Sequence, residues 1–294
     1  MYKKFYFIVN PEAGKGKKLS FIPEIQTFCR EHKLEYEKVL TKEPKEATRL
    51  AREAAKNFEV VVAVGGDGTI SEVAAGIYDT PAVLGILPTG SGNDFAPMVG
   101  ISKDLKKALR TLINGHVRNV DLGIVNGKYI FVNGMGVGFD GEAAARVRKY
   151  LKYFPGYPGY LAAVLRTLVT YRFRKARIVL DDHEVMEKKI LLIATCNGTQ
   201  YGGGFRVAPS AEIDDGLFTV CQIDKMGRFY ALRNIPKIMK GTHLKLPEVH
   251  TFTAKKVSIE SSHNMQAQLD GELLPLMKKF EIEMMPGKLS VLSN

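Results

Sequence analysis

Short apolar runs and amphipathic stretches alternate through the first 114 residues. The apolar runs are rich in β-branched or aromatic residues, which predicts buried strands, and the stretches between them carry apolar residues at helical spacing. Strands are expected at 5–10, 34–41, 60–64 and 82–87, and helices at 19–32, 44–56, 70–77 and 103–114. Because strand and helix alternate with short links, the sequence predicts a parallel sheet with right-handed crossovers.

From about residue 124 the pattern changes to closely spaced strands with few helices between them. The Asn126-Gly127 dipeptide predicts a hairpin over 124–133. Further strands are expected at 177–180, 189–197, 216–223, 255–260, 265–269, 280–284 and 289–292, and helices at 141–149, 159–171 and 225–239. This half is predicted to be an antiparallel sandwich. We therefore expect an α/β domain at 1–123 and a β-sandwich domain at 124–294, with a final strand at about 287–294 able to return to the first domain.

Composition and charge narrow the class of protein. The 294 residues are 45% hydrophobic and 25% charged, as in an ordinary globular protein with room for two cores. Three widely spaced cysteines, Cys29, Cys196 and Cys221, fit buried thiols in a reducing cytoplasm. No apolar run approaches the roughly 18 residues of a transmembrane helix, and the N-terminus lacks a signal-peptide pattern. The net charge of +11 favours an anionic partner, whether nucleotide, nucleic acid or membrane.

The stretch 60–72 (VVVAVGGDGTISE) places a glycine turn between a buried strand and a helix. Such a turn presents free backbone N–H groups and the positive end of a helix dipole to a phosphate. Asp67 would repel an anion there unless it holds a divalent metal that bridges to the phosphates. The stretch therefore suggests a magnesium–nucleotide site, although Gly and Asp also dominate simple tight turns.

A second glycine turn, 88–95 (PTGSGNDF), follows the next strand. Open α/β sheets bind ligands at the carboxyl ends of their strands, so the two turns are expected to face one crevice. Asp121 again lies near a strand. The basic loop 11–18 lacks the Gly-x4-Gly-Lys-Ser/Thr pattern of a P-loop.

Three further patterns have both a functional and a structural interpretation. Residues 136–141 match G-x-G-x-x-G, but no acid occurs from 143 to 180, so we do not interpret them as a dinucleotide site. Residues 146–177 carry nine Lys/Arg, no Asp/Glu and seven aromatic rings, which suits a membrane interface, single-stranded nucleic acid or a solvated helix pair with buried tyrosines. The acidic loop 208–217 and the turn 269–272 are each compatible with cation binding or catalysis, and with ordinary turns.

Several of these motifs together resemble the soluble bacterial diacylglycerol kinase and lipid kinase family, in the family's order and over nearly the whole chain. They are Asn10-Pro11 with Gly14, Gly65-Gly66-Asp67-Gly68-Thr69, Pro88-Thr89-Gly90-Ser91-Gly92-Asn93-Asp94, the segment 208–216 and Leu269-Asp270-Gly271-Glu272. The resemblance implies an N-terminal nucleotide domain like that of NAD kinases and phosphofructokinases. It also implies a C-terminal β-sandwich, with ATP in the cleft between them.

The resemblance also implies roles for individual residues. The ATP site would comprise Asn10, Pro11, Glu12, Ala13, Gly14, Thr41, Gly65, Gly66, Asp67, Gly68, Thr69, Glu72 and Thr89. Asp67, Asp94 and Asp121 would organise the catalytic Mg²⁺, Glu272 would be the base, and Asp270 would belong to the same catalytic group. A structural Mg²⁺ would lie on Asp215 and the backbone oxygens of Glu212 and Leu217. The family often has a basic residue at the position of Glu212, but only its carbonyl is needed.

The sequence therefore favours an ATP-dependent lipid kinase that converts diacylglycerol to phosphatidic acid. Phosphatidylglycerol or a sphingoid base are alternative substrates, and a NAD kinase would share the Gly-Gly-Asp-Gly turn. A NAD kinase acts on a soluble dinucleotide and would not need the basic aromatic segment. A nucleotide-sensing binding protein that is not an enzyme would not need the acidic residues of the site. The expected partner is a lipid at an anionic membrane surface, with no nucleic acid, and a homodimer is left open. The expected location is the cytoplasm, with membrane contact through a helical segment over 141–177.

Overall fold

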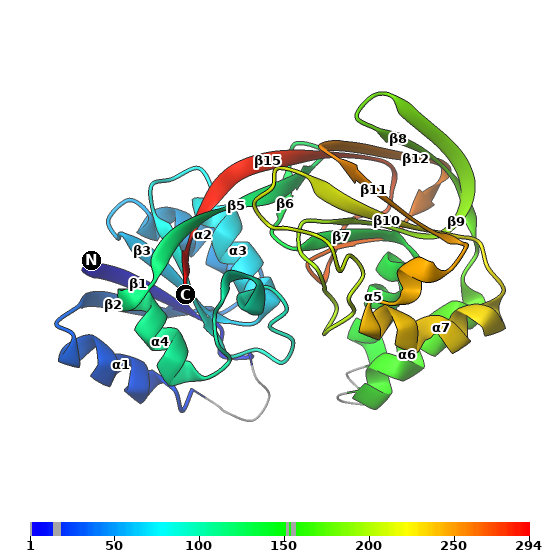
Figure 1. The fold of residues 1–294 in the computed structure, drawn as a ribbon. Helices are drawn as coiled ribbons and strands as arrows, with labels where there is room; N and C mark the ends of the chain where they lie inside the picture. Colours follow the sequence, from blue (N-terminus) through cyan, green and yellow to red (C-terminus); the bar gives the residue numbers. More distant parts are fainter. Residues whose placement is uncertain (1, 14–18, 151–152, 154–156) are drawn as a thin grey trace. The chain divides into compact units, whose positions relative to one another are not determined.

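The computed structural model describes residues 2–13, 19–150, 153 and 157–294, which fold into two compact units (Figure 1). Unit 1 comprises Met1–Leu122 and Pro286–Asn294, and unit 2 comprises Gly123–Met285. The chain passes from one unit to the other twice, along strands β5 (His116–Val125) and β15 (Met277–Ser293). The C-terminal residues are therefore part of the first unit.

A parallel sheet forms the centre of unit 1. Its strands lie in the order β4-β3-β1-β2, and the end of β15 joins beside β4, with Val291 opposite Leu84. The bounds are β1 (Lys4–Val9), β2 (Glu35–Leu40), β3 (Val60–Gly65) and β4 (Val83–Pro88). Every residue of β3 and β4 is buried, as expected for central parallel strands that are covered on both faces.

Helices cover both faces of this sheet, with α2 and α3 on one face and α1 and α4 on the other (Figure 1). The bounds are α1 (Ile22–Glu31), α2 (Glu46–Ala54), α3 (Asp67–Ile77), the 3₁₀ turn η1 (Ala96–Val99) and α4 (Leu105–Asn114). Close packing of α2 on α3 depends on Gly76, where an added Cβ would lie 2.6 Å from the Ala51 Cβ. Strands β1 to β4 and helices α1 to α4 lie where the sequence predicts them, because each shows a clear apolar period, whereas the 3₁₀ turn η1 was not predicted.

Unit 2 is built from antiparallel strands. One path runs β14-β13-β7-β9-β8-β12-β15, and β10 pairs with β9 and β11. The bounds are β6 (Tyr129–Phe131), β7 (Gly134–Gly138), β8 (Arg174–Leu180), β9 (Glu184–Cys196), β10 (Phe218–Asp224), β11 (Val249–Ala254), β12 (Lys256–Met265), β13 (Ala267–Leu269) and β14 (Glu272–Leu273). The helices are α5 (Phe139–Tyr150), α6 (Tyr157–Thr170), α7 (Arg228–Lys240) and the 3₁₀ turn η2 (His243–Lys245).

Unit 2 has two apolar cores. The first is formed by inward-facing residues of the strands, including Phe131, Phe218 and Phe280. The second contains Leu191, Leu192 and other residues of β9 and β10, together with residues of α6 and α7. The strands thus have an apolar interior of their own, and helices pack on the outer face of part of the sheet.

Several elements differ from the sequence-based prediction, and residues 116–123 of β5, strand β14 and the 3₁₀ turns η1 and η2 are among those not predicted. The two strands expected at 280–284 and 289–292 are one strand, β15, because Pro286-Gly287 is accommodated within it, with Gly287 at φ +61°. Strand β7 was not predicted because three of its five residues are glycine, which has low strand propensity. Strand β11 was also not predicted. The hairpin turn is as expected, since both Asn126 and Gly127 have positive φ.

Candidate functional site

The start of helix α3 is the first part of the site in unit 1. Gly66, the residue before the helix, is extended at φ −98°, and no side chain caps the helix. The first hydrogen bond of the helix runs from the Ile70 N–H to the Gly66 carbonyl at 3.1 Å. The N–H groups of the first turn, at Asp67, Gly68 and Thr69, are therefore left for a ligand, and the helix dipole favours an anion there.

Asn10 joins the loop after β1 to this helix turn. Its amide donates to the Thr69 hydroxyl at 3.1 Å, and its carbonyl oxygen accepts the Glu12 N–H at 2.9 Å. Gly65 leaves the space that Thr69 occupies, because a Cβ on Gly65 would lie 2.3 Å from the Thr69 Oγ1. The structure thus brings the predicted residues 10–13 and 65–69 together, whereas Gly14 lies outside the described residues.

Asp67 connects the first glycine turn to the second. Its Oδ1 accepts the backbone N–H of Asp94 at 2.7 Å and of Phe95 at 3.1 Å. Thr89 and Gly90 in turn donate their N–H groups to the Gly65 carbonyl at 2.9 and 3.1 Å. The two glycine turns, which were expected to face one crevice, are therefore joined to each other by hydrogen bonds within unit 1.

Two buried oxygens beside these turns have no hydrogen-bond partner among the described residues. They are the Thr89 Oγ1 and the Asn93 Oδ1. Asn93 adopts φ +55° and fixes its amide by donating to the Gly90 carbonyl at 2.8 Å, which leaves its side-chain oxygen available. Sequence reasoning did not single out Asn93; the signal was an Asn between Gly92 and Asp94, because Asn tolerates positive φ.

A cavity of about 560 Å³ opens next to these oxygens. The residues that line it come from the loop after β1, the start of α1, the turn after β4 and the start of α4, and are Ala13, Ser20, Phe21, Glu24, Pro88, Thr89, Gly90, Ser91, Asn93, Lys103, Asp104 and Leu105. Its size is in the range of small-molecule sites. A phosphorylated ligand with a bound cation is suited to this place, since the lining residue Gly90 touches Gly66 at the start of α3, and the unpartnered Thr89 and Asn93 oxygens also line the cavity.

The donor set also fits a hard cation. Among the described residues, Asp67 Oδ2 accepts no hydrogen bond, while Oδ1 is held by two N–H groups that fix the carboxylate. Asp94 is 4% exposed and lies one residue from the free Asn93 oxygen. Carboxylate and amide oxygens are the ligands that Mg²⁺ prefers. The residues present therefore fit a magnesium–phosphate ligand at this edge of the sheet.

Three other predicted residues of unit 1 have defined structural partners. Glu72 caps helix α2, because its carboxylate accepts the N–H of Lys45 at 3.1 Å and of Ala47 at 3.2 Å. Thr41 follows β2 and donates its N–H to the Val9 carbonyl at 2.9 Å. Asp121, which is 2% exposed, accepts the Gly287 N–H at 2.6 Å and so holds the returning C-terminal strand.

The predicted residues Asp270 and Glu272 form a cluster within unit 2. The Asp270 carboxylate accepts three successive backbone N–H groups, from Val132 at 2.8 Å, Asn133 at 3.0 Å and Gly134 at 2.9 Å. Asp270 itself adopts φ +46° and donates its N–H to the Gly134 carbonyl. Its carboxylate therefore anchors the turn that presents Glu272, which is half-buried on β14.

Sequence reasoning missed a buried polar network behind this turn. The Gly271 N–H donates to the Gln268 side-chain oxygen at 2.8 Å, and the Gln268 amide donates to Asp140 at 2.8 Å. Asp140 lies over Gly136, where an added Cβ would come within 1.8 Å of its carboxylate. The G-x-G-x-x-G sequence is thus a packing motif for a partly buried acid. Burial raises the pKa of Asp140, and burial together with the Asp140 charge raises that of Tyr201.

The segment proposed for the structural Mg²⁺ forms a turn before β10. Asp215 is exposed and accepts the Leu217 N–H at 2.9 Å, while Glu212 is exposed three residues earlier. Across the residues that the structure describes, there is no group of three acidic, histidine or cysteine side chains that could hold a metal. A set of one carboxylate and two carbonyls, as expected here, stays a prediction.

The basic aromatic segment folds mainly into helix α6 and strand β8, and most of its described rings pack inward. The Tyr171 ring packs between Phe139 and Phe173 and is only 2% exposed. The Tyr160 and Phe205 rings pack together with their centroids 5.6 Å apart. Tyr153 is the exception, with 72% of its surface exposed. Lys152 lies outside the described residues. Within the described part of the chain, no helix is long and apolar enough to cross a bilayer.

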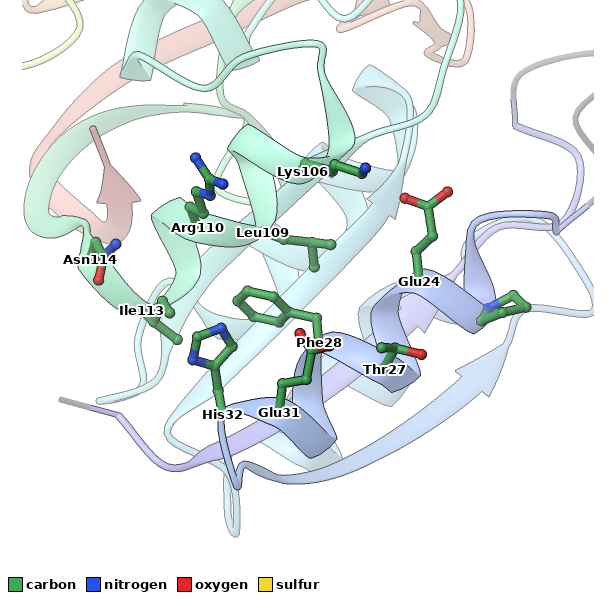
Figure 2. A pocket seen from close by; sticks show the side chains of 11 residues that line it. Glu24, Thr27, Phe28, Glu31, His32, Lys106, Leu109, Arg110, Ile113 and Asn114 are labelled. Carbon is green, nitrogen blue, oxygen red and sulfur yellow. The ribbon is translucent and has the colours of Figure 1, made fainter.

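A larger groove, of about 700 Å³, lies between α1 and α4 (Figure 2). The rings of Phe28 in α1 and of His32, which directly follows α1, pack together in it with their centroids 4.5 Å apart. Glu24, Lys106 and Arg110 lie around it. The described residues that line this groove include none of the predicted site residues. Size alone therefore does not identify the site.

Known protein families match both parts of the chain. Residues 4–125 match the diacylglycerol kinase catalytic domain, and residues 133–293 match the YegS C-terminal NAD kinase beta sandwich-like domain. A diacylglycerol kinase of Staphylococcus saprophyticus is 31% identical over 275 residues, which cover 92% of this chain and 90% of that protein.

Solved structures show the same fold. A crystal structure of a proposed diacylglycerol kinase from Bacillus anthracis matches with a TM-score of 0.82 at 25% identity, covering 100% of this chain and 98% of that chain. An NAD kinase from Archaeoglobus fulgidus, solved in complex with ATP, matches with a TM-score of 0.58 at 14% identity. The match covers 99% of this chain and 94% of that chain. These matches confirm the expected NAD kinase-like α/β domain and β-sandwich domain. Because the sequence match extends over nearly the whole chain, the chain belongs to the diacylglycerol kinase family and is a lipid kinase.

Proposed function

We propose that this lipid kinase transfers the γ-phosphate of ATP to the hydroxyl of diacylglycerol and releases phosphatidic acid and ADP. The relatives named diacylglycerol kinase support the acceptor, and the ATP complex of the similarly folded NAD kinase supports the donor. The observation that carries the proposal is the uncapped start of α3 beside the unpartnered Thr89 and Asn93 oxygens. That combination suits a phosphate with its counterion better than it suits an ordinary turn.

The N–H groups of Asp67, Gly68 and Thr69 would bind the phosphates of ATP, and Asn10 would hold Thr69 in place. Gly68 faces open space, so a phosphate is able to approach the backbone closely there. Phosphoryl transfer depends chiefly on positioning and on charge stabilisation, since its transition state is loose and negatively charged. Fixed amides at a helix start serve both purposes because they need no reorganisation.

Mg²⁺ would be held by Asp67 and Asp94, with Asp121 as a further candidate. Bound there, the ion would neutralise charge that builds up on the phosphates during transfer. The chain's own contribution is to fix the Asp67 carboxylate through the Asp94 and Phe95 N–H groups, at 2.7 and 3.1 Å. Asp215, Glu212 and Leu217 are proposed to hold a second, structural ion.

Glu272 is proposed to act on the acceptor hydroxyl. The bond between the γ-phosphorus and the ADP oxygen breaks, a bond from the lipid oxygen to phosphorus forms, and the hydroxyl proton passes to the Glu272 carboxylate. A glutamate is too weak to remove that proton in advance, so it orients the hydroxyl and takes the proton late. Asp270 would be a positioning residue here, because its carboxylate is occupied by three N–H groups.

The acceptor is a membrane lipid, so we propose peripheral contact with an anionic bilayer from the cytoplasm. Exposed groups of 141–177 contribute to such contact, namely Lys149 of α5, Tyr153 between the helices, and Arg166 and Val169 of α6. No nucleic-acid partner is proposed, and a homodimer is left open.

The test is transfer of label from γ-labelled ATP, with Mg²⁺, to diacylglycerol, phosphatidylglycerol, sphingosine or NAD presented separately. The proposal predicts label in diacylglycerol, reduced by about 100-fold or more in Asp67→Asn. Asn retains an acceptor for both N–H groups but loses the charge, and Asp79→Asn serves as the control at an exposed aspartate of the same unit. Label only in another lipid, or only in NAD, would contradict the proposed acceptor.

A further inference from the structure

Helix α7 of unit 2 presents two contrasting faces. The inner face, with Ala231 and Ile238, packs on the second core and borders an apolar cavity of about 60 Å³. The outer face repeats at helical spacing, as positions 229, 232, 233, 236, 237 and 240 fall on one side of the helix. The inner face accounts for the attachment of α7 to the unit, but the composition of the outer face is left unexplained.

The outer face carries large apolar groups that are exposed to water. Phe229 is the most exposed large hydrophobic residue of the described chain, at 82%, and Leu232 lies one turn further along at 38%. Tyr230 beside them is 39% exposed. A phenylalanine this exposed gains nothing from folding, whereas clustered exposed apolar residues mark surfaces that contact a partner or a membrane.

The same face is strongly positive. Residues 225–245 contain Lys225, Arg228, Arg233, Lys237, Lys240 and Lys245 and no Asp or Glu. Arg228 donates to the Tyr171 carbonyl and Lys225 lies over the Phe173 ring, so these two have partners within the unit. The ion pairs seen among the described residues involve none of Arg233, Lys237 and Lys240. These three cations are available to an anionic surface.

We propose that the outer face of α7, namely Phe229, Leu232, Arg233, Pro236, Lys237 and Lys240, docks on an anionic lipid bilayer. The apolar groups enter the headgroup region while the cations meet the lipid phosphates. The proposal rests on the proposed function, because a kinase for diacylglycerol must meet a substrate that resides in a bilayer. A protein partner would need acidic groups that match these cations, whereas an exposed helix face of mixed Phe, Leu, Arg and Lys suits the surface of an anionic bilayer.

This face differs from the segment that the sequence singled out. In 146–177 most of the described aromatic rings pack against other residues of the unit. The number of rings in this segment is therefore larger than the number that solvent reaches. Helix α6 nevertheless lies against α7, and its Val169 is 62% exposed. The two helices together extend the docking surface, with α7 providing its most exposed apolar residue.

The chain contains no tryptophan, so Phe229→Trp introduces a single fluorescent reporter at the centre of the proposed face. Its emission should shift to the blue, and brominated lipids should quench it, when vesicles of phosphatidylcholine and phosphatidylglycerol are added. Val117→Trp, at a 42% exposed position of unit 1, is the matched control and should not respond. An unresponsive Phe229→Trp in protein that binds these vesicles would overturn the proposal, as would a response to an oligonucleotide but not to vesicles.

A second set of variants tests the charges. Reversal of Arg233, Lys237 and Lys240 to Glu should weaken binding to these vesicles about 100-fold or more, since each cation near the surface contributes roughly a factor of five. Reversal of Lys128, Lys255 and Lys278, exposed cations elsewhere on unit 2, changes the net charge equally and should have a smaller effect. Equal losses in the two variants would overturn the proposal.

Activity separates this proposal from the proposed function. On a short-chain diacylglycerol dissolved as monomers, the α7 charge variant should turn over like the wild type, and only its activity on vesicles should fall. Equal activity of variant and wild type on vesicles would overturn the docking surface while leaving the kinase assignment intact. Absence of transfer to any lipid by the wild type would instead contradict the proposed function, and the fluorescence result would still decide whether α7 binds membrane.

Discussion

The backbones of Gly66 and Gly90 touch, so that a Cβ added to Gly90 would lie 2.3 Å from the Gly66 Cα. Gly66 precedes α3 and Gly90 follows β4, and this contact sets the separation of the two turns that form the candidate nucleotide site. Neither glycine has a positive φ, so the requirement for glycine here is one of space.

Gly90→Ala should therefore destabilise the protein by about 1–3 kcal/mol, as overpacking against a backbone does. Gly68→Ala is the matched variant, since nothing lies within 4 Å of a Cβ there and the residue is in the first turn of α3. It should leave stability unchanged or raise it by up to about 1 kcal/mol. Urea unfolding measures both free energies.

The variants Gly90→Ala and Gly68→Ala also distinguish an effect on folding from an effect on ligand binding. If a phosphate approaches the backbone at Gly68, the Gly68→Ala protein should fold well yet bind ATP about 10-fold or more weakly. Unchanged ATP affinity in Gly68→Ala would remove this residue from the phosphate site, and unchanged stability in Gly90→Ala would mean that the turns are able to move apart.

Asp270 should matter for stability as well as activity. Replacement by Ala leaves three backbone N–H groups without their acceptor and places Ala at φ +46°, so we expect a loss of about 2–3 kcal/mol. Asp270→Asn tolerates the positive φ and keeps one acceptor oxygen, so its loss should be smaller. Thermal and urea unfolding of the two variants test this order, and equal stability of wild type and Asp270→Ala would refute the anchoring role.

The partly buried Asp140 predicts a specific pH dependence. Burial raises its pKa above the ordinary value of 3.8, against the hydrogen bond from Gln268. The folded protein then keeps a proton that the unfolded chain has lost, so this group's contribution to stability is full below about pH 4 and falls as pH rises towards the folded pKa. The slope has an upper limit of about 1.4 kcal/mol per pH unit.

Asp140→Asn has no proton to lose and should flatten that part of the stability profile. Urea unfolding of both proteins from about pH 4 to 8 provides the measurement. Parallel profiles for wild type and Asp140→Asn would show that Asp140 does not titrate between the folded and unfolded states in this range.

The sequence predicted the α/β unit closely because strong periodicity and glycine turns coincide there. The bond from Asp67 to the turn after β4 follows from the same logic, since parallel strands bring their carboxyl ends to one edge. The strand β7 and the single long β15 were not predicted, because glycine-rich and Pro-Gly sequences give turn signals that tertiary pairing overrides.

The site was only partly predictable for a different reason. Asn93, Gln268 and Asp140 matter through contacts between distant segments, and such contacts leave no local spacing in the sequence. The role of Asp270 as an acceptor for residues 132–134 is of the same kind. The basic aromatic segment shows the converse, because its composition indicated a surface, whereas Tyr171 is buried and Tyr160 and Phe173 pack against other rings.

Phosphoryl transfer in this protein is expected to require Glu272. The measurement is the rate of phosphatidic acid formation from ATP and a short-chain diacylglycerol, compared between wild type and Glu272→Gln, with folding checked by thermal unfolding. We predict turnover in the wild type and a loss of about 100-fold or more in kcat for Glu272→Gln, with KM for ATP little changed, because general-base catalysis typically contributes that much. Wild-type turnover in a well-folded Glu272→Gln protein, or no phosphatidic acid from the wild type, would contradict the account.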